Sequence, residues 1–329
     1  MNGWTEAVRV VGERLGVGPG LAGTAVVLIL FLTGGTVLRG WARLRRSDPE
    51  TRRRWGSVFT WWTLTILFIV VLALGPPAVV VVMGGLALLL VREAVRLVDR
   101  RHLLLPGFLL VAGIYAWAWM DWRTLFLAAL PMLLLVLATL EALWRWSAAR
   151  EGITPPWLEG ARPLATALFL TVVGPSYAVA AAYLPAPAEL PESGMGWFAL
   201  LFVLTELNDS AQAWGGRAFG VRRMAPVLSP GKTWAGFWSG VLTTAAASAV
   251  FAPLITSYGG WLRLDALGLG VLVALAGIAG DLLESSLKRR AGVKDSGDLL
   301  PGHGGLMDRF DSLATTAPVF FVVTWFLWF

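Results

Sequence analysis

The chain has 329 residues, of which 57% are hydrophobic and only 15% are charged. A soluble protein of this length needs a larger charged fraction to cover its surface, so the composition excludes an ordinary soluble domain and favours a membrane protein. The chain has no cysteine, which excludes disulfides, cysteine metal sites and a thiol nucleophile. Its formal net charge is +6. Because the basic residues cluster between apolar runs, we interpret this charge as a membrane-orientation signal and expect no nucleic-acid partner.

A helix needs about 20 mostly apolar residues to cross the hydrocarbon core of a bilayer. Ten runs meet or approach this length, so the sequence predicts an all-α polytopic membrane protein with about ten transmembrane helices. The runs cover residues 21–38, 57–75, 77–92, 104–120, 124–143, 163–185, 194–213, 234–256, 264–283 and 312–329. The third run is short and follows Gly75-Pro76-Pro77, which is typical of a tilted, partial or re-entrant segment. The polar lead 1–20 lacks the pattern of a signal peptide, so we expect the first span to be retained.

Basic residues divide unequally between alternate loops. If the Arg-rich loop 39–56 faces the cytoplasm, the other side receives only four of the 27 Lys and Arg residues, namely Arg9, Arg14, Arg123 and Arg263. This asymmetry predicts a multi-pass protein of the cell inner (plasma) membrane, with the polar segments of the C-terminal half facing the cytoplasm. The linker 147–162 divides the chain into an N-terminal membrane-helix half, 1–150, and a motif-bearing half, 151–329.

Two predicted helices carry acidic side chains within apolar sequence, where such groups are costly and mark candidate functional sites. In run 194–213, Glu206 and Asp209 are three residues apart on one helical face. In run 264–283 and its continuation, a second face carries Asp281, Glu284, Ser285 and Lys288. The alternative interpretation is that these acids form ion pairs that only hold helices together.

The segment 285–311 combines basic, acidic and glycine residues. Asp308 and Asp311 are three residues apart where the last helix is expected to begin, and Gly297, Gly302, Gly304 and Gly305 allow tight turns and close approach to a ligand. Carboxylates suit Mg²⁺, while Lys and Arg neutralise phosphate oxygens, so this mixture favours a site for phosphates with bound metal. A solvated charged loop would explain the charges, but not the density of glycine and paired aspartate.

The loop between the seventh and eighth runs brings further basic residues to the same predicted surface, including Arg217 and Lys232. Its Gly231-Lys232-Thr233 triplet invites a P-loop interpretation. We reject it because Pro226 occupies the place of the first required glycine and no strand leads into the segment.

Residues 285–311 read S-x-L-K-R-x4-K-D-x-G-x2-L-P-x-H-G-G-L-x-D-R-F-D. This run resembles the diagnostic pattern of the phosphatidate cytidylyltransferase (CDP-diacylglycerol synthase) family at every fixed position. The upstream G-D-L-L-E-S and S-P-G-K-T-W segments are also similar, so the resemblance covers about residues 205–311. At Ala235, directly after K-T-W, members of the family often have an acidic residue. Gln212 and Trp214 also differ from the residues that are common in the family's upstream motif. These differences leave the preferred lipid open.

The resemblance implies that CTP and phosphatidic acid react to CDP-diacylglycerol and pyrophosphate in phospholipid biosynthesis, with Mg²⁺ and one or two cations in all. The expected catalytic residues are Asp281, Asp308, Lys288 and Arg309, and the expected metal ligands are Asp281, Asp308, Asp209 and Asp311. The expected substrate-binding residues are Arg217, Ser229, Lys232, Thr233, Ser285, Arg289, Lys294, Asp295, His303, Gly304 and Gly305. Membrane lipids are further expected partners, and the resemblance also suggests a homodimer.

Two alternatives stay open at this point. One is a related CTP-dependent transferase or kinase that acts on another membrane lipid. The other is a non-catalytic lipid transporter, which the sequence disfavours because its polar groups lie in one half of the chain and face one side of the membrane.

Overall fold

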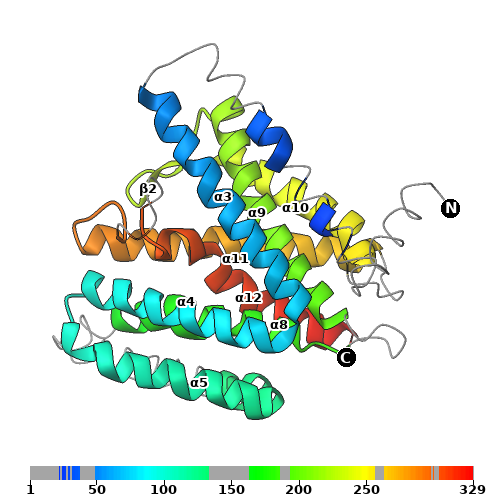
Figure 1. The fold of residues 1–329 in the computed structure, drawn as a ribbon. Coiled ribbons are helices and arrows are strands. Elements are labelled where there is room, and N and C mark those ends of the chain that lie inside the picture. The colour runs from blue at the N-terminus through cyan, green and yellow to red at the C-terminus, as the bar shows by residue number, and fades with distance from the viewer. Residues whose placement is uncertain are drawn as a thin grey trace, which may run out of the picture.

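The computed structural model describes residues 22, 24–26, 29, 32–37, 49–132, 163–185, 193–255, 263–297, 299 and 304–328. Almost all of them are helical (Figure 1). The predicted domain boundary near residue 150, most of the first predicted span and His303 lie outside these residues. The division into two halves therefore stays a prediction.

The first two long helices meet at a glycine. α3 (Pro49–Leu74) ends before Gly75, whose φ of 80° is a conformation that side chains other than glycine rarely adopt. α4 (Pro76–Leu97) then begins with proline, which suits the first helical turn because its missing N–H has no partner there anyway. α4 is longer than the apolar run 77–92 because the helix continues past the charged residues that end the run. Its 22 residues are enough for a complete crossing.

The boundary predicted between residues 120 and 124 corresponds to a helix kink. α5 (Leu104–Thr124), which follows a short 3₁₀ turn at Arg101–Leu103, loses helical geometry at Asp121. The Asp121 carboxylate accepts a hydrogen bond from the Thr124 backbone N–H at 3.2 Å, as an N-cap residue does at the start of a helix. The chain then enters a π-helical turn at Leu125–Ala129.

The described part of the C-terminal half contributes several helices and a short hairpin. These elements are α8 (Gly174–Ala182), preceded by a π-helical turn at Phe169–Val173, α9 (Ser193–Phe219), β1 (Arg223–Ala225), β2 (Ser229–Thr233), α10 (Trp234–Ile255), α11 (Arg263–Arg290) and α12 (Met307–Trp328). The antiparallel pair of β1 and β2 was not predicted. The Thr233 hydroxyl at its end accepts a hydrogen bond from the Gly236 N–H at 3.1 Å and so caps α10.

Six helices in the described part of the chain are long and apolar enough to cross a membrane. They are Pro76–Leu97, Arg101–Met132, Pro163–Ala182, Trp234–Pro253, Leu264–Arg290 and Met307–Trp328. These helices support an all-α, multi-pass membrane protein. The predicted count of about ten is not confirmed, because α9 and the full length of α3 are not among the six.

One buried core connects helices from both ends of the sequence. It contains side chains of α4, α5, α8, α9 and α12, among them the fully buried Trp197 and Phe320. Helices approach closely where glycine removes the side chain, as is common in membrane bundles. A Cβ atom at Gly174 of α8 would lie only 2.0 Å from the Ala314 carbonyl oxygen of α12. This contact fixes α8 against the helix that carries Asp308 and Asp311.

Aromatic side chains gather where α12 ends. Trp122 stacks on Tyr183 with ring centroids 5.9 Å apart and meets Trp325 at 6.1 Å. Trp197, near the start of α9, lies 6.1 Å from Trp328. These rings belong to the buried core or pack against it, so the cluster holds the end of α12 against the neighbouring helices.

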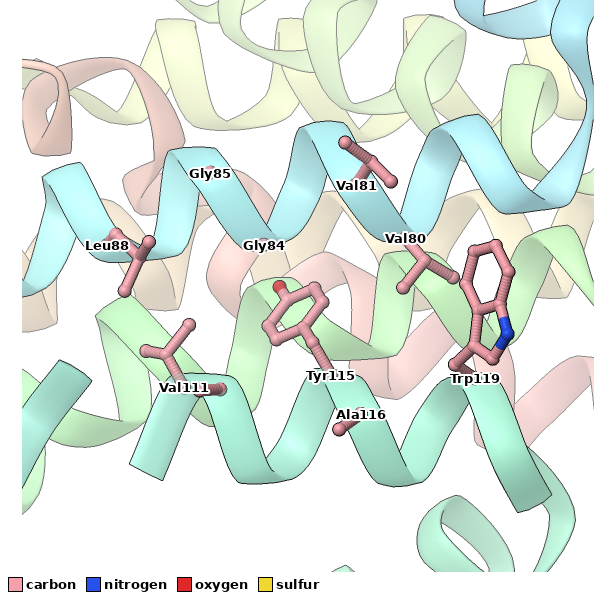
Figure 2. A pocket seen from close by; sticks show the side chains of 10 residues that line it. Val80, Val81, Gly84, Gly85, Leu88, Val111, Tyr115, Ala116 and Trp119 are labelled. Carbon is pink, nitrogen blue, oxygen red and sulfur yellow. The ribbon is translucent and has the colours of Figure 1, made fainter. Parts of the chain in front are cut away.

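An apolar groove of about 310 Å³ runs between α4 and α5 (Figure 2). Val80 and Leu88 of α4 line it, together with Val111 of α5. Tyr115 points from α5 toward Gly84, where an added Cβ would lie 3.2 Å from its ring. The groove therefore depends on the absence of a side chain at Gly84.

Candidate active site

The polar segments singled out in the sequence meet at one end of the bundle. β2 and the loop after α11 lie at this end (left in Figure 1), where α4, α9 and α11 finish and α10 and α12 begin. It is the end of α12 opposite the aromatic cluster. The three segments therefore share one end of the bundle.

Two predicted carboxylates converge on one hydroxyl. Ser312 Oγ of α12 lies 2.7 Å from Asp281 Oδ1 of α11 and 3.0 Å from Asp209 Oδ1 of α9. The Ser312 side chain is buried, and a hydroxyl has only one hydrogen to donate. Two carboxylates thus share this hydroxyl, and Asp209 has a further neutral donor in Gln212 Nε2 at 3.5 Å, an arrangement that favours a cation between the two acids.

Glycine makes this convergence possible. Gly280 precedes Asp281 on α11, and a Cβ there would lie 2.3 Å from the Asp311 carbonyl oxygen on α12. Any larger residue would push the two helices apart and carry Ser312 away from Asp281. Because Gly280 lets the backbones touch, side chains as short as serine and aspartate can meet across the interface.

Asp311 and Lys232 complete this first cluster. Asp311 directly precedes Ser312 on α12, and its carboxylate accepts a hydrogen bond from the Ser312 backbone N–H at 2.8 Å. Lys232 of β2 forms an ion pair with Asp281, and its ammonium also lies 3.4 Å from the Gln212 side-chain oxygen. Three carboxylates and one ammonium leave a formal charge of −2, which a divalent cation would neutralise.

A second cluster surrounds Asp308, one turn earlier on α12. Its carboxylate accepts hydrogen bonds from the backbone N–H groups of Ser296, at 3.0 Å, and Gly305, at 2.8 Å. The Lys288 ammonium lies 2.7 Å from Asp308 and 2.6 Å from the buried Glu284. Neither Glu284 oxygen has a well-directed hydrogen bond, so this nearby charge is its main compensation.

Oxygen ligands of this kind suit Mg²⁺. In the described residues, however, no three His, Cys, Asp or Glu side chains already stand in a metal-binding arrangement. The first cluster fits a divalent cation by its carboxylate oxygens and its excess negative charge. Asp308 belongs to the neighbouring cluster, in which Lys288 already compensates its charge.

The other predicted site residues that the structure describes lie on α9, β2, α11, α12 and the loop after α11. Arg289 donates to the Leu228 carbonyl at 3.2 Å and to the Val293 carbonyl at 3.0 Å, and so links the hairpin to the loop after α11. Gly304 has a φ of 81°, and a Cβ there would lie 2.7 Å from Asp308 Oδ2. Exposed side chains around the clusters are those of Arg217, Lys294, Asp295 and Arg309, while Ser229 and Ser285 are half-buried and Thr233 is buried.

Sequence reasoning missed two residues that organise the site. Ser312 directly follows Asp311, and its position one helical turn after Asp308 could have placed it on the same face. Glu93 lies on α4, outside the region of family resemblance, yet its carboxylate contacts the loop that holds Asp308. The sequence signal that could have pointed to Glu93 is an acidic residue at the end of an apolar run, between Arg92 and Arg96.

Residues 55–327 match the family model described as the cytidylyltransferase family. The chain belongs to the cytidylyltransferase family. This membership makes it a nucleotidyltransferase that uses CTP, and it extends the resemblance from the C-terminal motifs to almost the whole membrane bundle.

Relatives of this cytidylyltransferase match it either over most of its length or over a shorter segment at higher identity. The phosphatidate cytidylyltransferase of Mycobacterium bovis is 30% identical over 272 residues, which cover 79% of this chain and 85% of that protein. Shorter matches reach higher identity. The phosphatidate cytidylyltransferase of Pseudomonas aeruginosa is 43% identical over 130 residues, or 40% of this chain and 48% of that protein. An uncharacterised Escherichia coli protein, YnbB, is 51% identical over 121 residues, or 37% of this chain and 40% of that protein.

Proposed function

We propose that this cytidylyltransferase is a phosphatidate cytidylyltransferase, which converts CTP and phosphatidic acid to CDP-diacylglycerol and pyrophosphate in phospholipid biosynthesis. The observation that carries the proposal is the meeting of Asp209 and Asp281 at Ser312, directly beside Lys232 and at one end of a membrane bundle. The complete motif at 285–311 and the names of the relatives support the same substrates.

The reaction joins two highly anionic groups. A phosphate oxygen of phosphatidic acid attacks the α-phosphorus of CTP, the bond to the β-phosphate oxygen breaks, and pyrophosphate leaves with its electron pair. No covalent enzyme intermediate is needed, because the lipid phosphate is itself the nucleophile. Catalysis then consists mainly of positioning and charge neutralisation. Lys232 of the first cluster and Lys288 of the second would supply positive charge, and Arg289, Lys294 and Arg309 are exposed cations that could add to it.

Asp209, Asp281 and Asp311 are the residues that would hold Mg²⁺. The bound cation would neutralise phosphate charge and favour the departure of pyrophosphate. In the same proposal Ser312 orients two of these carboxylates. Asp308 holds Lys288 at the edge of the site, where its ammonium can face a phosphate oxygen.

The location of the two clusters suits these substrates. CTP is water-soluble, whereas phosphatidic acid keeps its phosphate at the headgroup plane, so the reaction belongs at a membrane surface. We propose that this surface is the cytoplasmic face of the cell inner membrane, in agreement with the excess of Lys and Arg in the loops on that side.

The direct test uses purified protein with labelled CTP, phosphatidic acid in mixed micelles and Mg²⁺. We expect CDP-diacylglycerol and pyrophosphate in equal amounts. Asp281→Asn and Asp308→Asn should each lower the rate by about 10³-fold, since each removes a charge from one cluster. Ser286→Ala is the matched control, because its hydroxyl donates to the Leu283 carbonyl of its own helix.

Competing acceptors separate this proposal from its alternatives. Other phospholipids and polyprenyl phosphates, added together with phosphatidic acid, should be used more slowly. A folded wild-type protein that consumes CTP only with another lipid would overturn the assignment to phosphatidic acid.

A further inference from the structure

Glu93 is a buried acid on α4 that the proposed reaction does not use directly. Only 2% of its surface is exposed, whereas its neighbours Arg92 and Arg96 are exposed and direct their charges elsewhere. A buried carboxylate is costly unless donors compensate it. Glu93 finds its donors on a segment more than 200 residues later in the chain.

Among the residues that the structure describes, three groups donate hydrogen bonds to the Glu93 carboxylate, and all three are uncharged. The Leu306 backbone N–H donates to Oε1 at 2.9 Å, and the Met307 N–H donates to Oε2 at 2.8 Å. The Ser296 hydroxyl lies 3.2 Å from Oε2. Leu306 and Met307 form the start of α12, where free N–H groups and the helix dipole both favour a negative charge. Glu93 therefore caps α12 from another helix.

The loop is shaped to receive this carboxylate. A Cβ at Gly297 would lie 2.8 Å from Glu93 Oε1, and a Cβ at Gly305 would lie 2.8 Å from Oε2. Neither glycine has a positive φ, so the requirement at both positions is space and not backbone conformation. Gly297 thus owes its place to a residue outside the 285–311 motif, whereas a Cβ at Gly305 would meet Ser296 Oγ of the motif, at 2.1 Å, before it met Glu93.

The same loop residues also hold Asp308. Ser296 donates its hydroxyl to Glu93 and its backbone N–H to Asp308. Gly305 donates its N–H to Asp308, and the next N–H, that of Leu306, points to Glu93. The two carboxylates accept hydrogen bonds from adjacent loop residues. A shift of these residues at Glu93 would therefore displace Asp308 and, with it, Lys288.

We propose that Glu93 is a positioning residue for cytidylyl transfer, which fixes Ser296 and residues 304–307 so that Asp308 and Lys288 face the substrate phosphates. The proposal rests on the proposed function of the site. Glu93 need not touch either substrate, and its effect passes through Asp308.

Glu93→Gln tests the proposal with little change in shape. The side-chain amide would turn its NH₂ group toward a backbone N–H, so at least one donor would lose its acceptor. We expect kcat to fall by about 10–100-fold, the usual effect of losing a hydrogen bond to a charged group that supports the transition state. The KM for CTP should change by less than about threefold. Ser296→Ala, which removes only one donor, should give a smaller loss in the same direction, and Arg92→Gln is the exposed neighbouring control.

Two further measurements distinguish positioning from general stability. In a variant that already carries Asp308→Asn, adding Glu93→Gln should lower kcat by less than about threefold further, because both changes act through the same group. Hydrogen exchange should accelerate about tenfold or more at residues 304–308 and stay unchanged in α9 and α10.

A kcat for Glu93→Gln within twofold of wild type would overturn the proposal, as would fully multiplicative losses in the double variant. Faster exchange throughout the bundle, or unchanged exchange at 304–308, would also overturn it. The exchange measurement needs no substrate. A wild-type protein inactive with every lipid acceptor would therefore refute the proposed function separately, while exchange still decides whether Glu93 anchors the loop.

Discussion

Lys288 Nζ lies 2.7 Å from Asp308 Oδ1 and so joins the last turn of α11 to the first turn of α12. The same ammonium compensates Glu284, which is fully buried. One lysine thus balances two carboxylates from different helices, and its loss would leave both without a countercharge.

Lys288→Met should therefore be among the most damaging single changes in the chain. Breaking a buried ion pair by removing one partner costs about 3–5 kcal/mol of folding free energy. We expect a lower unfolding temperature together with loss of cytidylyl transfer. Thermal unfolding in detergent and the CTP assay measure the two effects, and Arg290→Met serves as an exposed control on the same helix. A Lys288→Met protein as stable as the control would contradict the pairing.

Ser312→Ala probes the other cluster. It removes the one hydroxyl shared by Asp209 and Asp281, which should disturb both carboxylates and weaken any cation they hold. We expect an activity loss of about 10–100-fold and a higher Mg²⁺ concentration for half-maximal rate. Ser286→Ala should match wild type in both measurements. Equal Mg²⁺ dependence in the two variants would exclude Ser312 from the cation site.

The side of the membrane on which the candidate site lies can be measured with single introduced cysteines, because the chain contains no cysteine of its own. Val227→Cys places a thiol in the hairpin loop, where the native side chain is 86% exposed. Arg123→Cys places one near the opposite end of the bundle. An impermeant maleimide should label the Val227→Cys variant only in inside-out vesicles and the Arg123→Cys variant only in right-side-out vesicles. The reversed pattern would put the site outside the cytoplasm.

Adjacent glycines on α4 should respond differently to alanine. Alanine favours a helix by up to about 1 kcal/mol over glycine. A Cβ at Gly85 meets nothing within 4 Å, so Gly85→Ala should raise the unfolding temperature. Gly84→Ala should stabilise less, because its Cβ would crowd the Tyr115 ring at 3.2 Å. Thermal unfolding of both variants checks the difference, and an equal gain would argue against close packing of Tyr115 on Gly84.

Much of the fold could be predicted because hydrophobic length is a direct consequence of the bilayer. The spans at 234–256 and 264–283 correspond to α10 and α11, and the boundary near residue 121 is the capped kink at Asp121. The hairpin escaped prediction because its strands have only three and five residues and no alternating apolar pattern.

The site was predictable where its groups recur at helical spacing. Asp281, Glu284 and Lys288 share a face by sequence alone, and the structure places them along the α11–α12 interface. Which acid meets which base was not predictable, because this depends on helix contacts such as that at Gly280. The partners of Glu93 could not be predicted for the same reason, although the acidic residue itself stands out at the end of an apolar run. No local spacing connects it to a loop 203 residues away.

The distance between Glu93 and its donors also has a consequence for synthesis in the cell. α4 leaves the ribosome long before residues 296–307 exist, so the Glu93 carboxylate must enter the membrane without the amides that later compensate it. Water or lipid headgroups at the interface would have to solvate it in the meantime. Docking of α12 would then expel this solvent as one of the last events of assembly. A nascent chain that stops short of this helix would keep an uncompensated acid at its surface, a feature by which membrane quality control could distinguish it from the finished enzyme.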